Sequence, residues 1–477
     1  MESVSRPFPN PNLNIRTLSS SFPRGSFTVS RFPFDQWRNR PRLRAGRRPP
    51  VAAVAVANPR SDHDVVVIGA GIIGLAVARQ LLLSSDLSVA VVDAAVPCSG
   101  ATGAGQGYIW MAHKTPGSET WELATRSKQL WEELAESIRD QGKDPAEVLG
   151  WKKTGSLLVG RTLEESYMLE ERVKLLNQAG LQAEYLPASS LHSEEPALQI
   201  GKEGGAALVP DDCQLDASQT VAFIEEGNRQ FNSQGRYAEF YNDPALSLLR
   251  SSCTQMVEGV QTSKNNLYAK RAVVIAAGAW SGPLMKSLIV QPNLLPIPVK
   301  PRKGHLLLLE NFKDLQLNHG VMEVGYIDHQ VFPSSTRSFT PGAVEDDDTL
   351  SSISMTATLD VKRNLLLGSS RQFVGFSREM DESIVKRIWD RAGEFFPALK
   401  SLGNKIDKIR VGHRPYMPDG KPVIGPVPGL PNVLLAAGHE GSGLCLALGT
   451  AEMVADMILG NPKTIDHTPY SVEGRFC

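Results

Sequence analysis

The sequence predicts a mixed α/β (α+β) fold that begins with a parallel β-sheet. Residues 64–68 are a short apolar run rich in β-branched side chains, which is typical of a buried parallel strand. A glycine-rich turn follows at once, and Leu75, Ala78 and Leu81 then fall on one side of a helical pattern. A second apolar run, residues 88–93, indicates the next strand. Strand, turn, helix and strand in this order predict a Rossmann-like unit.

The glycines of this turn have the spacing that a dinucleotide site needs. Gly69 permits a tight turn, Gly71 lets the backbone approach a pyrophosphate, and Gly74 lets helix and strand pack closely. The helix N-terminus favours negative charge, and Asp93 can accept hydrogen bonds from ribose hydroxyls. The alternative is a glycine-rich turn in an ordinary β-α-β unit. The residues expected to hold the dinucleotide are Gly69, Ala70, Gly71, Ile72, Ile73, Gly74 and Asp93.

Two further segments are candidates for contact with the same cofactor. Residues 98–107 hold four glycines, so their backbone amides could line it at Ala101 and Thr102; the alternative is a flexible linker. Residues 271–281 indicate a buried strand that ends in a turn at Gly278.

The middle of the chain carries elements with a structural role. A helix is expected from Ser118, as N-cap, to about residue 140. Strands are expected at residues 306–309 and within residues 353–376. The acidic run at residues 345–348 is predicted to be a solvated loop.

A third glycine-rich turn precedes the last helix. Residues 432–437 indicate a short strand, and a helix is expected over residues 444–459. A turn at a helix N-terminus is again a place for negative charge. The glycines of this turn that we expect to contact the cofactor are Gly438, Gly441 and Gly443.

The first fifty residues differ in composition from the rest. They contain ten arginines, no lysine and only two acidic residues, Glu2 and Asp35, and serine is frequent. This composition predicts a transit peptide over residues 1–58, for the chloroplast or, as the alternative, the mitochondrion. A disordered basic tail that binds RNA or membranes is the other interpretation.

Charge and cysteine content argue against several classes of function. The formal net charge of −1 gives no basic excess for a nucleic-acid partner. The five cysteines are dispersed and form no C-x-x-C pair, so we expect neither a disulfide framework nor a metal site. No run of 18 apolar residues is present, so we expect no membrane span.

Taken together, four motifs resemble the D-amino-acid oxidase-like FAD-dependent oxidoreductases, the group of glycine oxidase, sarcosine oxidase and D-amino-acid dehydrogenase. With its leader, the chain is similar to plant organellar members of this group. The motifs are residues 67–74 with Asp93, residues 100–103, residues 274–280, and Arg414-Pro415 with residues 418–420 and 438–443.

The resemblance implies two domains and FAD as cofactor. A discontinuous FAD-binding domain would comprise residues 60–115, 207–285 and 405–465. A substrate domain on an antiparallel sheet would comprise residues 116–206 and 286–404, and residues 466–477 would be a tail. Sarcosine oxidase-like members link flavin to a cysteine near the position that is Gly412 here, so non-covalent FAD is expected.

The resemblance also implies the chemistry, a hydride transfer from the α-carbon of a small amine or amino acid to flavin N5. Arg414 would hold a substrate carboxylate. His439 is a second candidate for contact with flavin or substrate, with a hydrogen bond inside the turn as the alternative. Arg371 and His305 are further candidates on the substrate side. The arginine or lysine that relatives carry in the last turn is missing from residues 440–443.

Two other functions stay open at this point. A 2-hydroxy-acid dehydrogenase would use the same carboxylate clamp. A non-enzymatic, FAD-bearing assembly factor of an organelle complex is compatible with the altered last turn. The small-molecule substrate is unidentified, and oxygen, a quinone or another protein could accept the electrons.

Overall fold

The predicted parallel strands form the centre of a large sheet in the computed structural model, which describes residues 58–251, 256–289, 297–327, 351–402 and 405–475. The strands of this first sheet are β1 (Arg60–Ile68), β2 (Val89–Val92), β9 (Tyr237–Phe240), β10 (Ala245–Arg250), β11 (Val257–Thr262), β12 (Asn266–Ile275), β18 (Val423–Val427) and β19 (Leu430–Ala437). β1 runs parallel to β2 on one side and to β12 on the other. β2 then pairs in parallel with β9, and β12 with β19. Antiparallel pairing adds β11 and β10 beyond β12, and β18 beyond β19.

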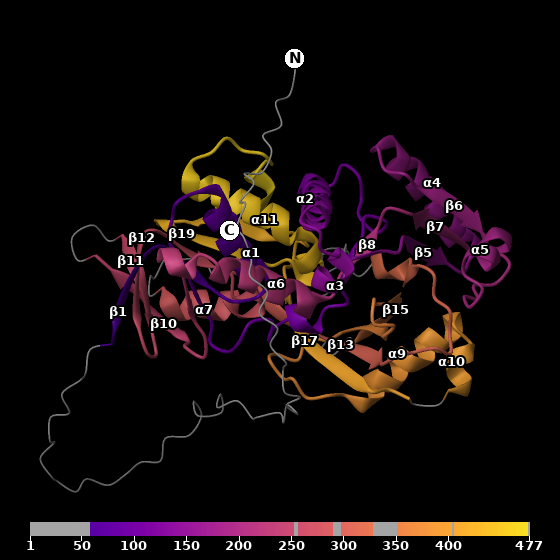
Figure 1. Cartoon of the computed structure of the whole chain (residues 1–477). Helices are drawn as coiled ribbons and strands as arrows, with labels where there is room; N and C mark the ends of the chain where they lie inside the picture. Colours follow the sequence, from indigo (N-terminus) through magenta and orange to yellow (C-terminus); the bar gives the residue numbers. More distant parts are fainter. Residues whose placement is uncertain (1–57, 252–255, 290–296, 328–350, 403–404, 476–477) are drawn as a thin grey trace, which may run out of the picture. The chain divides into compact units, whose positions relative to one another are not determined.

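Helices pack against the first sheet and against one another, and they bury the apolar side chains of its strands (Figure 1). These helices are α1 (Ile72–Ser84), α2 (Trp121–Asp140), α3 (Pro145–Leu149), α6 (Ala217–Arg229), α7 (Ser281–Leu288) and α11 (Gly443–Leu459). Helix α1 contacts α11 and α6, and α11 also contacts α2. Val65 and Val67 face one hydrophobic core and Val66 faces another, and none of the three is exposed. Burial on both faces therefore produces the continuous apolar run seen in the sequence.

Helix α11 is the most apolar long helix of the described residues. With the turn before it, residues 440–459 are long and apolar enough to cross a membrane by composition, but over half of that window is buried inside the protein. Its side chains pack in the core with those of α1 and α2. Helix α2 begins at Trp121, with Thr120 as N-cap. The expected start at Ser118 was therefore early, because the Ser118 carbonyl accepts from the Trp121 N–H and closes a turn before the helix.

A second sheet of eight strands carries the middle of the chain. In spatial order its strands are β17 (Lys408–Tyr416), β13 (Lys300–Leu309), β16 (Leu365–Arg371), β15 (Ser352–Leu359), β14 (Gly320–Glu323), β5 (Ser156–Gly160), β7 (Gly205–Val209) and β6 (Glu184–Pro187). All neighbours pair antiparallel except β14 and β5, which pair in parallel. The predicted antiparallel sheet is thus confirmed, with one parallel contact between its two halves.

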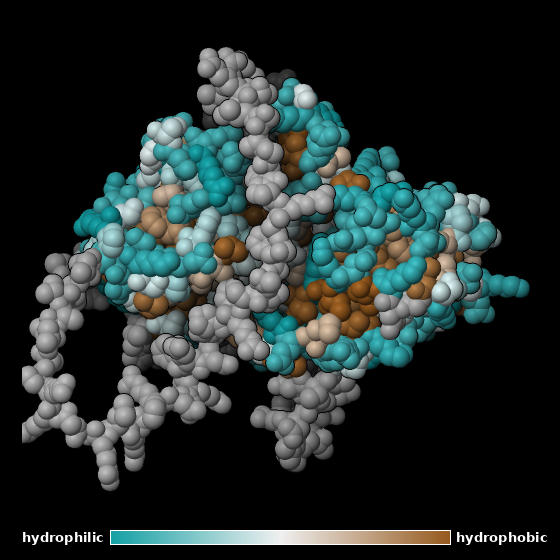
Figure 2. Space-filling view, turned by 60° about the horizontal axis from the view of Figure 1, so that its bottom comes forward, coloured by the Kyte–Doolittle hydropathy of each residue, from teal (hydrophilic) through white to brown (hydrophobic). Residues whose placement is uncertain are grey.

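Short helices and a small third sheet complete the described chain. The helices beside the second sheet are α4 (Leu163–Gln178), α5 (Ala188–Glu194), α9 (Glu382–Phe395) and α10 (Ala398–Ser401). The third sheet consists of β3 (Tyr108–Ile109), β8 (Cys213–Gln214) and β4 (Lys152–Lys153). On the face drawn in Figure 2 the surface is mostly hydrophilic, with hydrophobic residues gathered in a recessed area.

The division into an FAD-binding domain and a substrate domain, with its boundaries, stays a prediction. β17 lies in a range expected for the FAD-binding domain but pairs with β13 in the second sheet. β7, at the start of another such range, also belongs to the second sheet. The predicted leader, apart from Asn58, and the acidic run at residues 345–348 lie outside the described residues.

Candidate functional site

Two glycines of the first turn are required by the packing of the backbone itself. Gly69 has a φ of +117°, and a Cβ there would lie 2.3 Å from the carbonyl oxygen of Ala276 at the end of β12. A Cβ on Gly74 would lie 1.9 Å from the carbonyl oxygen of Gly69. Both distances are far below any real contact, so strand, turn and helix can come together only with glycine at these positions.

Gly71 differs, because the protein leaves space beside it. Within 4 Å a Cβ on Gly71 would meet only the Thr102 hydroxyl, 3.4 Å away. The first N–H groups of α1 have no partner within the helix, and the N–H of Ile72 donates to Thr102 Oγ1 at 3.2 Å. A helix N-terminus beside an open glycine fits a pyrophosphate group.

Asp93 holds the turn in place from the end of β2. Its two carboxylate oxygens accept from the N–H groups of Ala70 and Ala95, each at 2.7 Å. Burial raises the pKa of this carboxyl, and the two N–H donors oppose that rise. Each oxygen keeps a lone pair that could accept a ribose hydroxyl, so Asp93 fits the role expected of it.

The second and third candidate segments come together with the first turn. Cys98 donates its N–H to the Ala70 carbonyl, which ties the loop that carries Ala101 and Thr102 to the turn. That loop forms the 3₁₀ turn η2 (Thr102–Ala104). Gly278, in the turn η4 (Gly278–Trp280) after β12, has a φ of +54° and no heavy atom within 4 Å of a Cβ. Like Gly71, Gly278 therefore has open space beside it.

The last glycine-rich turn, η5 (Glu440–Ser442), opens helix α11. Gly438 has a φ of +77°, and a Cβ there would lie 2.4 Å from Met417 Cγ. A Cβ on Gly441 would lie 3.1 Å from the Tyr326 hydroxyl and 3.6 Å from the Tyr108 hydroxyl. A Cβ on Gly443 would lie 3.7 Å from the Cβ of His439, an ordinary contact. The turn therefore faces two phenols from elsewhere in the fold.

The two phenols form a buried polar pair beneath two arginines. Tyr108 and Tyr326 are joined through their hydroxyl groups at 2.7 Å. The Arg371 guanidinium lies over the Tyr326 ring, 4.4 Å from its centre. Burial alone would raise the pKa of Tyr326, but the charges of Arg371 and Arg414 lower it. Burial raises the pKa of Tyr108, so Tyr326 is the more acidic of the two.

Arg414 lies in β17, beside the end of β16. Its Nη1 donates to the carbonyl of Ser370 at 2.8 Å. The neighbouring strand makes room for it, because a Cβ on Gly304 would lie 2.3 Å from that nitrogen. A Cβ on Gly441 would lie 3.9 Å from Arg414 Cδ, so the arginine also approaches the last turn. The structure thus brings Arg414 to the tyrosine pair.

Glu440, in the same turn, is neutralised by Arg302. Arg302 Nη2 lies 2.5 Å from Glu440 Oε1, and their side chains are only 8% and 16% exposed. Glu440 also has a φ of +47°, which is uncommon for a residue with a side chain. The ion pair therefore holds a strained residue at the start of α11, a role that the sequence did not reveal.

Lys114 brings a cation to the turn that has none of its own. Its Nζ donates to Ser442 Oγ at 2.5 Å, and the side chain is buried. Burial lowers the pKa of this ammonium group. Lys114 lies after β3, far from the turn in sequence, so its place could not be read from the turn itself. The only signal was a His-Lys pair directly after an apolar run.

The two candidate histidines make hydrogen bonds within the fold. His439 Nε2 lies 3.0 Å from Thr450 Oγ1 of α11, and burial lowers the pKa of the ring to about 3. His305 Nδ1 lies 2.9 Å from Ser370 Oγ, and burial lowers its pKa to about 4. Both rings are neutral at pH 7. A direct role of His439 with flavin or substrate stays a prediction.

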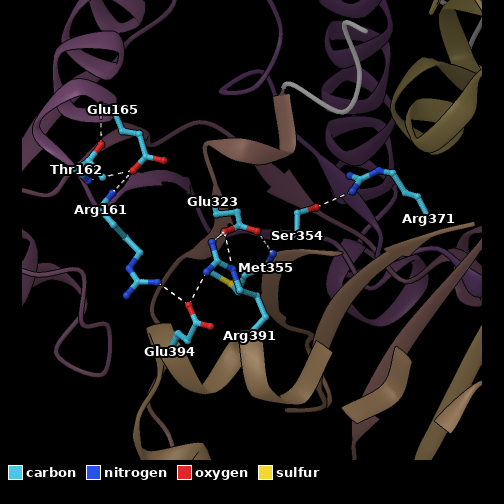
Figure 3. Close-up of polar contacts among 9 residues, drawn as sticks. All are labelled: Arg161, Thr162, Glu165, Glu323, Ser354, Met355, Arg371, Arg391 and Glu394. Carbon is cyan, nitrogen blue, oxygen red and sulfur yellow. Dashed lines mark hydrogen bonds and ion pairs between the residues drawn. The ribbon is translucent and has the colours of Figure 1, made fainter. Parts of the chain in front are cut away.

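A separate hollow of about 620 Å³ lies beside α4 and α9, lined in part by charged residues that pair with one another. Arg161 reaches Glu394 at 2.7 Å, and Arg391 bridges Glu394 and Glu323 (Figure 3). Because these charges satisfy each other, we assign the hollow no function. Among the described residues, no group of three or more His, Cys, Asp or Glu side chains is placed to hold a metal ion.

Comparison with known proteins agrees with these features. A family model described as FAD dependent oxidoreductase matches residues 64–457. Glycine oxidase of Pseudomonas aeruginosa is 27% identical over 87% of this chain and 100% of its own length, and glycine oxidase of Bacillus licheniformis is 26% identical over 84% and 95%. The crystal structure of glycine oxidase from Geobacillus kaustophilus superposes with a TM-score of 0.71 at 23% identity, over 87% of this chain and all of its own.

Proposed function

The chain belongs to the family of FAD-dependent oxidoreductases, and on that basis we propose that it oxidises a small amine or amino acid. Its cofactor is FAD, bound without a covalent bond. The glycine turns and Asp93 would hold the dinucleotide, with the pyrophosphate at Gly71 and the N-terminus of α1. When bound, FAD supplies the two-electron chemistry, and the protein supplies binding, orientation and electrostatics.

The observation that carries the proposal is Arg414 beside the tyrosine pair and the last glycine turn. A guanidinium has five N–H donors in a planar fork, which suits a carboxylate. The Ser370 carbonyl accepts from one nitrogen of Arg414, and no described residue is an ion-pair partner of its guanidinium. Arg414 could therefore hold the carboxylate of an amino acid and direct its α-carbon toward the flavin. The glycine oxidases that the chain resembles support an amine donor.

The proposed reaction is a balanced two-electron step. Bound FAD would supply the acceptor for the hydride of the α-carbon. The substrate ammonium group would lose one proton first, so that loss of the hydride would leave an iminium ion, which water would hydrolyse. The substrate nitrogen must lose its positive charge before the hydride leaves. Tyr326, whose pKa the two arginines lower, is placed to accept a hydrogen bond or proton from that nitrogen.

The test is anaerobic reduction of the FAD-loaded full chain by candidate substrates. The loss of flavin absorbance measures the reduction. Amino acids and secondary amines would be compared with the 2-hydroxy acids of the same skeleton. We expect an amine to bleach the flavin and its hydroxy analogue to leave it oxidised. Bleaching by the hydroxy acid alone would replace the amine donor with a 2-hydroxy acid. Flavin that only dithionite reduces would count against both and favour a non-enzymatic role.

A further inference from the structure

Cations outnumber acids around the tyrosine pair, and Lys114, Arg302 and Arg371 are buried, whereas Arg414 is partly buried. Lys114, Arg302, Arg371 and Arg414 all reach the pair or the last turn, whereas Glu440 is the acid that accompanies them there among the described residues. Glu440 is matched by Arg302 at 2.5 Å. The other three cations are left without a carboxylate partner in the described part of the chain.

Among the described residues, these three cations make hydrogen bonds only to neutral oxygen atoms, although Arg371 also lies over the Tyr326 ring. Lys114 donates to Ser442 Oγ at 2.5 Å, and Arg414 donates to a main-chain carbonyl at 2.8 Å. Arg371 donates Nη1 to Ser354 Oγ at 2.7 Å (Figure 3). Its Nη2 is buried and has no hydrogen-bond partner among the described residues, and the residue is only 4% exposed. A buried charge without a counter-ion is strongly unfavourable, so the arrangement implies an anionic ligand.

One ordinary carboxylate does not balance this charge. If Tyr326 is ionised, it offsets one of the three cations, and the α-carboxylate of an amino acid offsets a second. One cation still lacks an anion. Arg414 on β17 and Arg371 on β16 lie on the two strands that flank β13, whereas Lys114 follows β3 and donates to Ser442, next to Gly441. The cations therefore surround the tyrosine pair from different sides.

We propose that the substrate is an amine with two carboxylates, the first held by Arg414 and the second by Lys114 and Arg371. This inference rests on the proposed amine oxidation and adds the substrate class to it. Lys114 and Arg371 are then specificity-determining residues, because an uncharged side chain would leave them unpaired. The last turn itself provides no cation, and Lys114 supplies one from elsewhere in the fold.

The test compares paired substrates, with and without a second carboxylate, on the FAD-loaded full chain under anaerobic conditions. Aspartate would be paired with asparagine and glutamate with glutamine, in both enantiomers, and iminodiacetate would be paired with sarcosine. The ratio of the flavin reduction rate to the apparent Kd is read for each compound. We expect each diacid to exceed its neutral partner by about 10- to 100-fold, the range of one charge-assisted hydrogen bond. This comparison needs no variant.

Variants then locate the effect. Lys114→Met should lower the ratio of reduction rate to apparent Kd by about 10- to 100-fold for the diacids. For their neutral partners the ratio should change by no more than a few-fold. Lys114→Arg should restore most of the loss. Lys174→Met is the matched control, because Lys174 is an exposed lysine on α4 that pairs with Glu171. The flavin spectrum of each variant shows whether FAD binding is intact.

The outcomes separate this inference from the proposed function. If neutral amino acids bleach the flavin as well as their diacid partners do, the amine oxidation stands and the diacid inference is overturned. The diacid inference is also overturned if Lys114→Met slows reduction by diacids and by neutral amino acids equally, because Lys114 would then act on the flavin and not on the second carboxylate. If no amine of either class bleaches the flavin, the proposed function itself fails.

Discussion

At the residue scale, the three glycines of the first turn have different physical roles. Gly69 and Gly74 are required by backbone contacts, whereas Gly71 faces open space. We therefore expect Gly71→Val to fold but to purify without FAD, because the side chain would occupy the place of the pyrophosphate. Gly74→Val should instead fail to fold. Flavin absorbance and a thermal melt of each variant measure this, and a yellow Gly71→Val protein with one FAD per chain would refute the assignment.

Arg414 gives the second prediction at this scale. Arg414→Ala should lower the rate of flavin reduction at low substrate by about 10- to 100-fold for carboxylate substrates, since a charge-assisted hydrogen bond is lost. FAD should stay bound, because Arg414 makes no contact with the glycine turn of β1. Arg414→Lys should recover only part of the activity, since a lysine lacks the planar fork. Unchanged kinetics in the alanine variant would remove Arg414 from the site.

The sequence identified the residues whose spacing along the chain carries meaning. Gly69, Gly71 and Asp93 could be found because strand, turn, helix and strand are consecutive. Lys114 and Tyr326 could not, since the fold brings the segments that follow β3 and β14 to the start of α11 from distant parts of the sequence. Arg302 was missed for the same reason. Its partner Glu440 lies in the last glycine-rich turn, where nothing in the local sequence indicates an ion pair with β13.

At the scale of elements, the start of α11 depends on the ion pair between Arg302 and Glu440. Because the pair is largely buried, Arg302→Met should lower the free energy of unfolding by about 3 kcal/mol. The double variant Arg302→Met with Glu440→Gln should recover part of that loss. Arg161→Met, which breaks the half-exposed pair with Glu394, should cost less than about 1 kcal/mol. If urea unfolding showed equal losses of unfolding free energy for Arg302→Met and Arg161→Met, burial of the ion pair would have no effect on its contribution.

Helix α11 should also make stability depend on pH through His439. Burial lowers the pKa of this ring to about 3 from an ordinary 6.5, so the unfolded chain takes up the proton first as the pH falls. The stability is complete above pH 6.5 and is lost as the pH falls toward 3, by about 1.4 kcal/mol per pH unit. His439→Asn should lose less stability between pH 7 and pH 5. Equal losses of unfolding free energy in the wild-type chain and in His439→Asn, measured by urea unfolding at pH 7 and pH 5, would contradict this.

At the scale of the whole molecule, the candidate site combines glycine turns at the first sheet with side chains from the second sheet, which are distant in the sequence. The parallel pair β1 and β2 followed from the sequence, because buried parallel strands and their glycine turns have a recognisable pattern, whereas the place of β12 beside β1 was not predicted. The membership of β17 and β7 in the second sheet did not follow, since strand pairing over long separations leaves no local signal. Arg414 and Arg371 were candidates from the resemblance, but their place beside the tyrosine pair followed only from the fold.

The central claim is that a hydride leaves the α-carbon of an amine for FAD bound at the glycine turns. The most direct measurement is the anaerobic bleaching rate of the FAD-loaded full chain with saturating substrate, with hydrogen or deuterium at the α-carbon. The account predicts slower bleaching with deuterium, because the bond to that atom breaks in the step observed. Equal rates, in a single turnover that bleaches all the flavin, would contradict it.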